Sequence, residues 1–228
     1  MTSTKTSDRS RRSFGTDMTP AEPAPDCSLC PRLVDFRTEN RAQYPDFFNG
    51  AVPSFGPDTA RLLIVGLAPG LKGANQTGRP FTGDYAGDLL YATLTKFGFA
   101  QGTYAARPDD GLSLTDCMVT NAVRCVPPQN KPIGSEINQC RAFLTARIGS
   151  LPRLSALVAL GRIAHDAVLR SHGHRISAFK FGHGAAHDLG GVTLFDSYHC
   201  SRYNTNTRRL TPEMFEAVFA QVRRHLDA

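Results

Sequence analysis

The residues from Arg61 to Leu90 constrain the fold most strongly, because a short apolar run there is followed by a long glycine-rich segment. The run at residues 62–65, bounded by a charge and a glycine, predicts a buried strand of a parallel sheet. A helix is predicted from Asp84 or Tyr85 toward Phe97. Long connections within a compact domain usually serve a function, and loops that leave a parallel strand commonly form binding sites. An ordinary strand-to-helix connection is the alternative.

The glycines of this segment allow backbone N–H groups to approach a ligand closely. They stand at positions 66, 70, 73, 78, 83 and 87. The segment does not match GxGxxG, and it lacks the Gly-Lys-Ser/Thr ending of a phosphate-binding loop. Neither common nucleotide-binding motif therefore applies.

Strands and helices alternate along the rest of the chain. Apolar runs predict strands at residues 116–123, 154–160 and 191–196, and helices are predicted at 133–148, at 161–170 and from Thr211 to Leu226. Residues 172–187 are polar and glycine-rich, which predicts a mobile or β-hairpin connection. The alternation predicts an α/β fold with a parallel sheet covered on both faces. The glycine-rich segment, Asn121 and His199 all follow strands, so we expect them to meet at one edge of the sheet.

Composition and charge limit the kinds of partner and the cellular location to be expected. The 228 residues carry a formal net charge of +6, which suggests a polyanionic partner without choosing among DNA, RNA and an anionic membrane. No apolar run approaches the ~20 residues of a membrane span, and the polar start of the chain lacks a signal-peptide core. A cytoplasmic protein is expected. Residues 1–26, rich in Ser, Thr, Arg and Pro, are predicted to be a disordered lead-in to a single domain at 27–228.

The sequence contains six cysteines. In an intracellular chain, closely spaced cysteines point to a metal or redox site more often than to disulfides. Cys27 and Cys30 form a CxxC motif, and Cys125 and Cys140 lie together in a second segment. Four thiolates from two segments fit either tetrahedral zinc or an iron–sulfur cluster, and the spacing does not choose between them. Cys117 falls within an apolar run and is expected to be a buried strand residue.

Three side chains have the chemistry of a base-binding site, and each also has an ordinary structural explanation. Asn121 can pair with a base edge at two points, or it can cap a turn. Phe81 can stack on a planar ring or belong to the core. His199 can stabilise a developing anion, or it can be a satisfied polar residue at a strand end. The loop that follows carries polar side chains suited to phosphate contact or to insertion into a duplex: Ser201, Arg202, Tyr203 and Asn206.

Four segments in order resemble the uracil-DNA glycosylase superfamily, most closely its family 5, or type B, branch of bacteria and archaea. They are GLAPG at 66–70, GANQTGRPFTGD at 73–84, TNAVRC at 120–125 and SYHCSR at 197–202. The resemblance extends from Cys27 to the last helix. It implies a three-layer α/β/α fold around a four-stranded parallel sheet. It also implies a structural 4Fe–4S cluster on Cys27, Cys30, Cys125 and Cys140, and a monomer that acts on DNA containing uracil or other deaminated bases, associated with the nucleoid.

The resemblance also assigns roles. Phe81 would stack on the flipped base, Asn121 would read its edge, and His199 would hydrogen-bond the uracil O2 as charge builds there. The loop from Cys200 to Asn206 would hold the base out of the stack. Cys200 departs from the Pro that normally follows the His, which affects the geometry expected of this loop.

The first motif bears on catalysis and on specificity. Many members of the superfamily carry an acid in this motif that positions water. This sequence has Leu67 and Ala68 there instead, as the type B branch does. Asp84 and Asn75 are then the nearest polar candidates for holding the water. Gly66, Ala68 and Gly70 are expected at the base pocket, and Gly70 replaces a bulky aromatic that rejects thymine.

The small Gly70 implies a roomier pocket and broad specificity, with hypoxanthine, hydroxymethyluracil and ethenocytosine as further substrates. The favoured interpretation is a monofunctional DNA glycosylase that initiates base excision repair. Two alternatives remain: a superfamily member that forms a covalent adduct with the abasic site through its His, and a non-catalytic iron–sulfur nucleic-acid-binding module.

Overall fold

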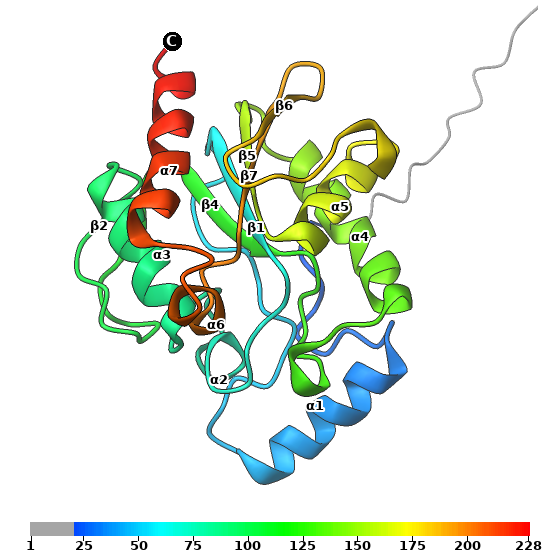
Figure 1. Ribbon diagram of the computed structural model, residues 1–228. Helices are drawn as coiled ribbons and strands as arrows, with labels where there is room; N and C mark the ends of the chain where they lie inside the picture. The colour runs from blue at the N-terminus through cyan, green and yellow to red at the C-terminus, as the bar shows by residue number, and fades with distance from the viewer. Residues whose placement is uncertain (1–20) are drawn as a thin grey trace, which may run out of the picture.

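A five-stranded sheet forms the centre of the computed structural model, which describes residues 21–228 (Figure 1). The strand order is β4-β1-β5-β7-β6. The strands are β1 (Leu62–Gly66), β4 (Cys117–Asn121), β5 (Ala156–Leu160), β6 (Ala186–Asp188) and β7 (Thr193–Ser197). The first four in spatial order are parallel, which confirms the predicted four-stranded parallel sheet, and the short β6 adds an antiparallel edge to β7. Of the segment 172–187, predicted to be a mobile or β-hairpin connection, only residues 186 and 187 lie in β6, and residues 172–185 form no strand.

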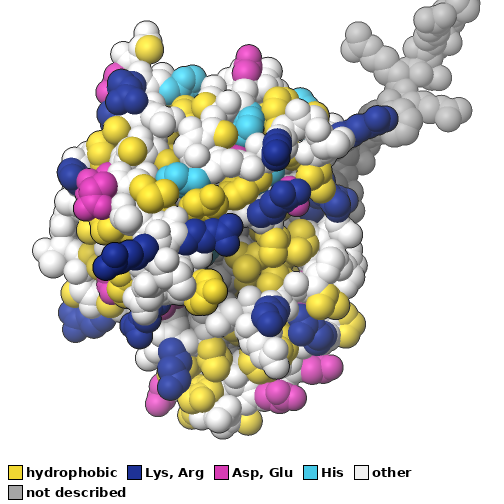
Figure 2. Space-filling model, viewed as in Figure 1, with side chains coloured by type: hydrophobic (Ala, Val, Ile, Leu, Met, Phe, Trp, Pro, Cys, Tyr) yellow, Lys and Arg dark blue, Asp and Glu magenta, His cyan; other side chains and the backbone are white. Residues whose placement is uncertain are grey.

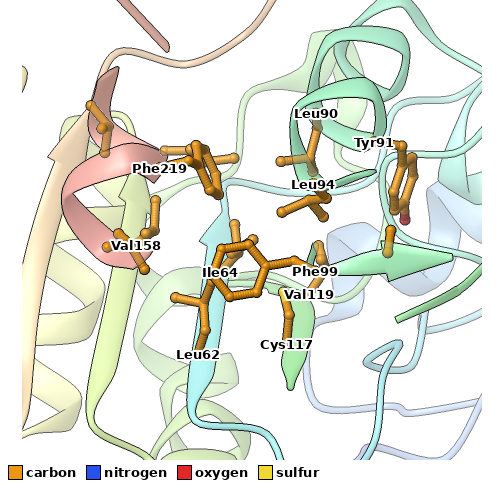
Figure 3. Close-up of a cluster of buried hydrophobic side chains, with 14 of the residues drawn as sticks. Leu62, Ile64, Leu90, Tyr91, Leu94, Phe99, Cys117, Val119, Val158 and Phe219 are labelled. Atoms are coloured by element: carbon orange, nitrogen blue, oxygen red, sulfur yellow. The ribbon is translucent and has the colours of Figure 1, made fainter. Parts of the chain in front are cut away.

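Helices cover both faces of this sheet, so the fold is a three-layer α/β/α sandwich. On one face Leu62 and Ile64 pack against α3 (Tyr85–Lys96) and α7 (Pro212–Leu226), as Figure 3 shows. On the other face Leu63 and Val65 pack against α4 (Gly134–Gly149) and α5 (Arg162–Ser171). Alternate side chains of a strand point to opposite faces, so a strand buried on both sides is a continuous apolar run. That is the pattern by which β1 was predicted.

One longer helix and several short elements were not predicted from the sequence. They are α1 (Pro31–Gln43), α2 (Ala74–Thr77), the two-stranded sheet of β2 (Ala100–Gln101) and β3 (Ser113–Leu114), α6 (Arg202–Asn206), and 3-10 turns at Pro128–Asn130 and Ile176–Ala178. The helix α1 buries only Leu33, Arg37 and Asn40, so it has no apolar stripe for sequence periodicity to detect. The predicted cap of α7 is confirmed, because Thr211 Oγ1 accepts the Met214 N–H at 3.2 Å. No helix within residues 21–228 has the length and apolar character needed to cross a bilayer.

The start of the packed domain differs from the prediction. Glu22 accepts hydrogen bonds from the guanidinium groups of Arg124 at 2.7 Å and Arg147 at 2.6 Å. Arg124 is only 1% exposed, and a buried cation needs a paired anion. The prediction of disorder is therefore wrong for residues 21–26, which belong to the domain, and its remainder at 1–20 lies outside the described residues.

Candidate active site

A pocket of about 260 Å³ opens at the carboxyl ends of the parallel strands. The loop after β1, the end of β4 and the residues after β7 converge there, as expected for a sheet of this topology. The pocket brings together six of the residues singled out in the sequence with three apolar neighbours. Its lining is Ala68, Pro69, Gly70, Ala74, Phe81, Asp84, Ala86, Asn121 and His199.

Asn121 is the last residue of β4, and it pairs in register with Gly66 of β1. Its side-chain Oδ1 is buried and has no hydrogen-bond partner among residues 21–228. A Cβ atom on Gly66 would lie 2.4 Å from that Oδ1 and 2.5 Å from Phe81 Cζ. Gly66 therefore supports the pocket from behind instead of lining it. A buried polar atom without a hydrogen-bond partner costs about 1–3 kcal/mol of folding free energy. A ligand that donates a hydrogen bond to Asn121 Oδ1 would recover this cost, so the free oxygen favours ligand binding.

Phe81 forms a wall of the pocket from a strained backbone conformation, with φ at 53°. Its carbonyl oxygen accepts the Tyr104 O–H at 3.3 Å, and the neighbouring Pro80 carbonyl accepts the Tyr91 O–H at 2.5 Å. Its ring lies 5.9 Å from the His199 ring, centroid to centroid, at an interplanar angle of 27°. The ring is thus fixed in place before any ligand binds.

His199 follows β7, and burial lowers the pKa of its imidazole from 6.5 to about 4. The ring is therefore neutral at physiological pH, with one N–H to donate and one nitrogen to accept. The short helix α6 holds its backbone, since Asn204 Nδ2 donates to the His199 carbonyl at 2.8 Å. Cys200 is fully buried, with its Sγ 3.4 Å from the Ala86 carbonyl, so it fastens this turn to α3.

The two candidates for holding water lie in different environments. Asp84 lines the pocket and caps α3, where its carboxylate accepts the Gly87 N–H at 3.2 Å. Desolvation by burial raises the pKa of Asp84. Asn75 does not line the pocket: it is buried, and its Nδ2 donates to Asn49 Oδ1 at 2.9 Å. The structure therefore brings Asp84, and not Asn75, to the site.

A wider groove adjoins the pocket and shares Ala68, Gly70, Asp84, Ala86 and His199 with it. Lys72, Ser201 and Arg202 extend this groove, and the Arg202 guanidinium lies 5.3 Å from the centre of the Tyr85 ring. Figure 2 shows Lys and Arg side chains spread across the face that carries α2 and α6. Tyr203 is 74% exposed, and Asn206 is also exposed and lies at the end of α6, outside the groove lining. This surface suits a polyanion.

A sequence profile of the uracil DNA glycosylase superfamily matches residues 53–223, which include every residue of the pocket. The chain belongs to this superfamily. It is 46% identical over 204 residues to a type-5 uracil-DNA glycosylase of Thermus thermophilus, covering 87% of this chain and 93% of that protein. It is 41% identical over 209 residues to one of Mycobacterium leprae, covering 87% and 90%. A type-4 uracil-DNA glycosylase of Sulfurisphaera tokodaii is 29% identical over 200 residues, covering 84% and 78%. The resemblance stated from the motifs is thus confirmed.

Behind the pocket of this uracil-DNA glycosylase superfamily member lies an ion pair that the sequence did not reveal. Arg79 donates to both carboxylate oxygens of Asp110 at 2.8 Å, and the Asp110 side chain is fully buried. The pKa of Asp110 is held well below its usual range by the Arg79 hydrogen bonds. The guanidinium also lies 5.6 Å and 5.8 Å from the ring centres of Tyr91 and Tyr104. This pair therefore supports the two tyrosines that hold the Pro80–Phe81 backbone.

The four cysteines assigned to a metal site surround a second pocket, of about 330 Å³. Cys27 and Cys30 precede α1, Cys125 follows β4, and Cys140 lies on α4. Burial raises the pKa of the Cys125 thiol to about 12 and that of Cys140 to about 11. Thiolates at such positions need a compensating cation, which a bound metal supplies.

The sulfur atoms of these four cysteines are not close enough together to hold a single metal ion as they stand. Among residues 21–228, no three of these sulfur atoms all lie within 4.8 Å of one another. A tetrahedral zinc ion with bonds of ~2.3 Å holds its sulfur ligands only ~3.8 Å apart. The four cysteines therefore gather at one pocket without forming a closed set of ligands for a metal ion. Cys117 is a buried residue of β4, as predicted.

Proposed function

We propose that this protein is a DNA glycosylase that flips uracil out of DNA and hydrolyses its N-glycosidic bond, the first step of base excision repair. The observation that carries the proposal is the pocket in which Phe81, Asn121 and His199 meet. Both the superfamily match and the type-5 relatives support it. Enzymes that act on a base within a duplex must extrude it into such a pocket.

Three side chains of the pocket have a defined task in this reaction. The Phe81 ring stacks on the planar base, and the unpaired Asn121 amide binds the imide edge of uracil. When the bond between N1 of the base and C1′ of the sugar breaks, its electron pair stays on the base and spreads onto O2. The neutral His199 imidazole donates a hydrogen bond to that oxygen. Water then supplies the oxygen that bonds to C1′, and its proton balances the departing anion.

Water is positioned in our proposal by Asp84, because no acid stands at Leu67 or Ala68. The Asp84 carboxylate reaches the pocket from the start of α3, and it is the only acidic group in the pocket lining. Its raised pKa still leaves it a hydrogen-bond acceptor for water when it is ionised. We assign Asn75 a supporting role instead, since its amide binds Asn49.

Substrate range follows from the small residues at the pocket mouth. Ala68 and Gly70 leave space there, and a Cβ atom on Gly70 would lie 3.1 Å from Asp84 Oδ2. We propose that the enzyme also accepts hypoxanthine, hydroxymethyluracil and ethenocytosine. DNA would lie in the adjoining groove with its phosphates near Lys72, Ser201 and Arg202, and with Asn206 at the edge. Tyr203, the most exposed large hydrophobic side chain of the described residues, would enter the duplex.

We further propose that Cys27, Cys30, Cys125 and Cys140 hold a 4Fe–4S cluster. When bound, the cluster would serve as a structural cross-link, since the four residues join the start of α1 to α4 and to the segment after β4. Asn121 ends β4, so this cross-link would steady the strand that carries it. The protein would act as a monomer on nucleoid DNA in the cytoplasm.

Base release from synthetic duplexes tests the enzymatic proposal. Duplexes carrying uracil, hypoxanthine or ethenocytosine are incubated with the wild type, Asn121→Ala and His199→Ala, and alkali-labile sites are counted on a gel. Removing one donor to a developing anion lowers kcat by about 10²–10³-fold, which is the loss expected for His199→Ala. Asn138→Ala and His172→Ala, which lie outside the pocket, should retain full activity.

Two results would favour the alternatives. DNA binding without release of any base would identify a non-catalytic iron–sulfur binding module. A protein–DNA adduct that survives denaturant, and that disappears in His199→Ala, would identify covalent attachment to the abasic site.

A further inference from the structure

Away from the pocket, a second cluster of polar side chains lies where α5, β6 and β7 meet (Figure 1). His165 of α5 and Asp196 of β7 are fully buried, and the His187 side chain of β6 is 13% exposed. His165 Nδ1 lies 2.7 Å from Asp196 Oδ1, and His187 Nε2 lies 3.0 Å from Asp196 Oδ2. One potential ligand atom from each residue lies within 4.8 Å of the other two.

The hydrogen bonds around His165 require a positive charge in this cluster. His165 Nε2 lies 3.1 Å from the Phe179 carbonyl oxygen, which can only accept, so this nitrogen carries the hydrogen of a neutral ring. His165 Nδ1 then presents a lone pair to the Asp196 carboxylate, which is also electron-rich. The contact is attractive only when Nδ1 also carries a proton or when both atoms bind the same metal ion.

A metal ion can take the place of that proton, because His165 Nδ1, His187 Nε2 and the Asp196 carboxylate can all bind it together. Two imidazole nitrogens and a carboxylate form a donor set that first-row divalent ions prefer, and zinc binds such ligands at about 2.0–2.2 Å. Histidine ligands normally donate their other N–H to a backbone carbonyl, as His165 does to Phe179. The carboxylate is held as well, since Asp196 Oδ2 accepts the Gly182 N–H at 3.2 Å.

We propose that His165, His187 and Asp196 form a binding site for a divalent transition-metal ion, with Zn²⁺ as the expected ion. The site is separate from the four cysteines and does not depend on the glycosylase activity. Its partly exposed ligand, His187, gives the ion a route from solvent.

Such an ion would cross-link α5, β6 and β7 next to the segment that leads from β7 to His199. The segment between α5 and β6 contacts Tyr198, because His183 Nδ1 accepts the Tyr198 N–H at 3.1 Å and the two rings stack at 5.0 Å. Tyr198 directly precedes His199, and Asp196 lies on the same stretch of chain. Metal binding would therefore order the backbone that leads to His199, while touching no atom of the base pocket.

Zinc binding to the full chain, purified with its cysteine centre and stripped of loose metal by a mild chelator, tests the proposal. Titration with Zn²⁺ should show one bound ion per chain that is absent from both His187→Ala and Asp196→Asn. His174→Ala is the matched control, because His174 lies nearby, with its Nε2 3.2 Å from the Leu189 carbonyl, but is not part of the cluster. At Zn²⁺ a hundredfold above Kd, the Tm of the wild type should rise by about 5–10 °C, and the Tm of His187→Ala should not.

Cobalt distinguishes this site from the cysteines. Co²⁺ bound by nitrogen and oxygen lacks the intense charge-transfer absorption of a cobalt–thiolate centre. The proposal requires a Co²⁺ spectrum without that absorption in the wild type, lost in His187→Ala and retained in Cys125→Ala. If the wild type binds no Zn²⁺ or Co²⁺ outside the cysteines, or if His187→Ala binds it equally well, the proposal is wrong. The cluster is then a protonated histidine paired with a buried carboxylate.

Discussion

Replacing Gly66 with alanine should disable the pocket while leaving the strand intact. Gly66 lies in β1 with extended backbone, so an alanine there is not strained by its φ angle. The added Cβ atom would lie 2.4 Å from Asn121 Oδ1 and 2.5 Å from Phe81 Cζ. Carbon atoms in contact are ~3.5 Å apart, so both side chains must move by about 1 Å.

The structure gives the size of the effect. Phe81 has little room to yield, since its backbone is held by Tyr104 and its ring faces His199. A displacement of ~1 Å in a catalytic group can cost about 100-fold in rate, which is ~2.7 kcal/mol of transition-state stabilisation. Overpacking at a buried position also lowers the free energy of unfolding by about 1–3 kcal/mol.

Single-turnover release of uracil from a duplex, with enzyme in excess, measures this loss apart from product release. Gly134→Ala is the matched control, because no heavy atom lies within 4 Å of the Cβ atom that it adds. The Tm of each variant shows whether the protein remains folded at the assay temperature. If Gly66→Ala releases uracil within about threefold of the wild-type rate, the contact between Gly66, Asn121 and Phe81 does not set the geometry of catalysis.

Three further predictions concern the support of the site. Asp110→Asn leaves the Arg79 cation buried without its partner, so the free energy of unfolding in urea should fall by about 3–5 kcal/mol, whereas Asp109→Asn at the surface should change it by less than ~0.5 kcal/mol. The pKa of His199 is 6.5 in the unfolded chain and about 4 in the folded protein, so as the pH falls the unfolded chain binds a proton first. The free energy of unfolding should therefore fall by about 3 kcal/mol as the pH is lowered from 6.5 to 4. His199→Gln should lack this part of the acid sensitivity, and NMR should show a neutral His199 ring at pH 5.5. Cys125→Ser should lose bound iron, whereas Cys117→Ser, in β4, should retain it.

The strands β1 and β5 are the elements that the local sequence determines most directly. The runs at 62–65 and 156–160 are apolar without interruption because both faces of these strands are covered, so the local sequence alone indicates a buried parallel strand. The position of Asn121 and His199 at one edge then follows from topology. The Thr211 cap was predictable for a similar reason, since its partner lies in the next turn of the chain.

Contacts between distant residues were not predictable in this way. Arg79 pairs with Asp110, and His165 pairs with Asp196, across 31 residues in each case. Glu22 meets Arg124 and Arg147 over still larger separations, so a segment that is polar in composition becomes part of the domain. The helix α1, without an apolar stripe, likewise gave no signal of its own.

The sequence by itself determined the α/β fold and the edge of the sheet where the pocket forms, because these depend on periodicity and on chain direction. Only the tertiary structure decided that Asp84 reaches the pocket while Asn75 does not, that Gly66 supports Asn121 and Phe81, and that burial keeps His199 neutral. The reason is physical: desolvation, ion pairing and steric contact act through space, between groups that the chain order leaves far apart.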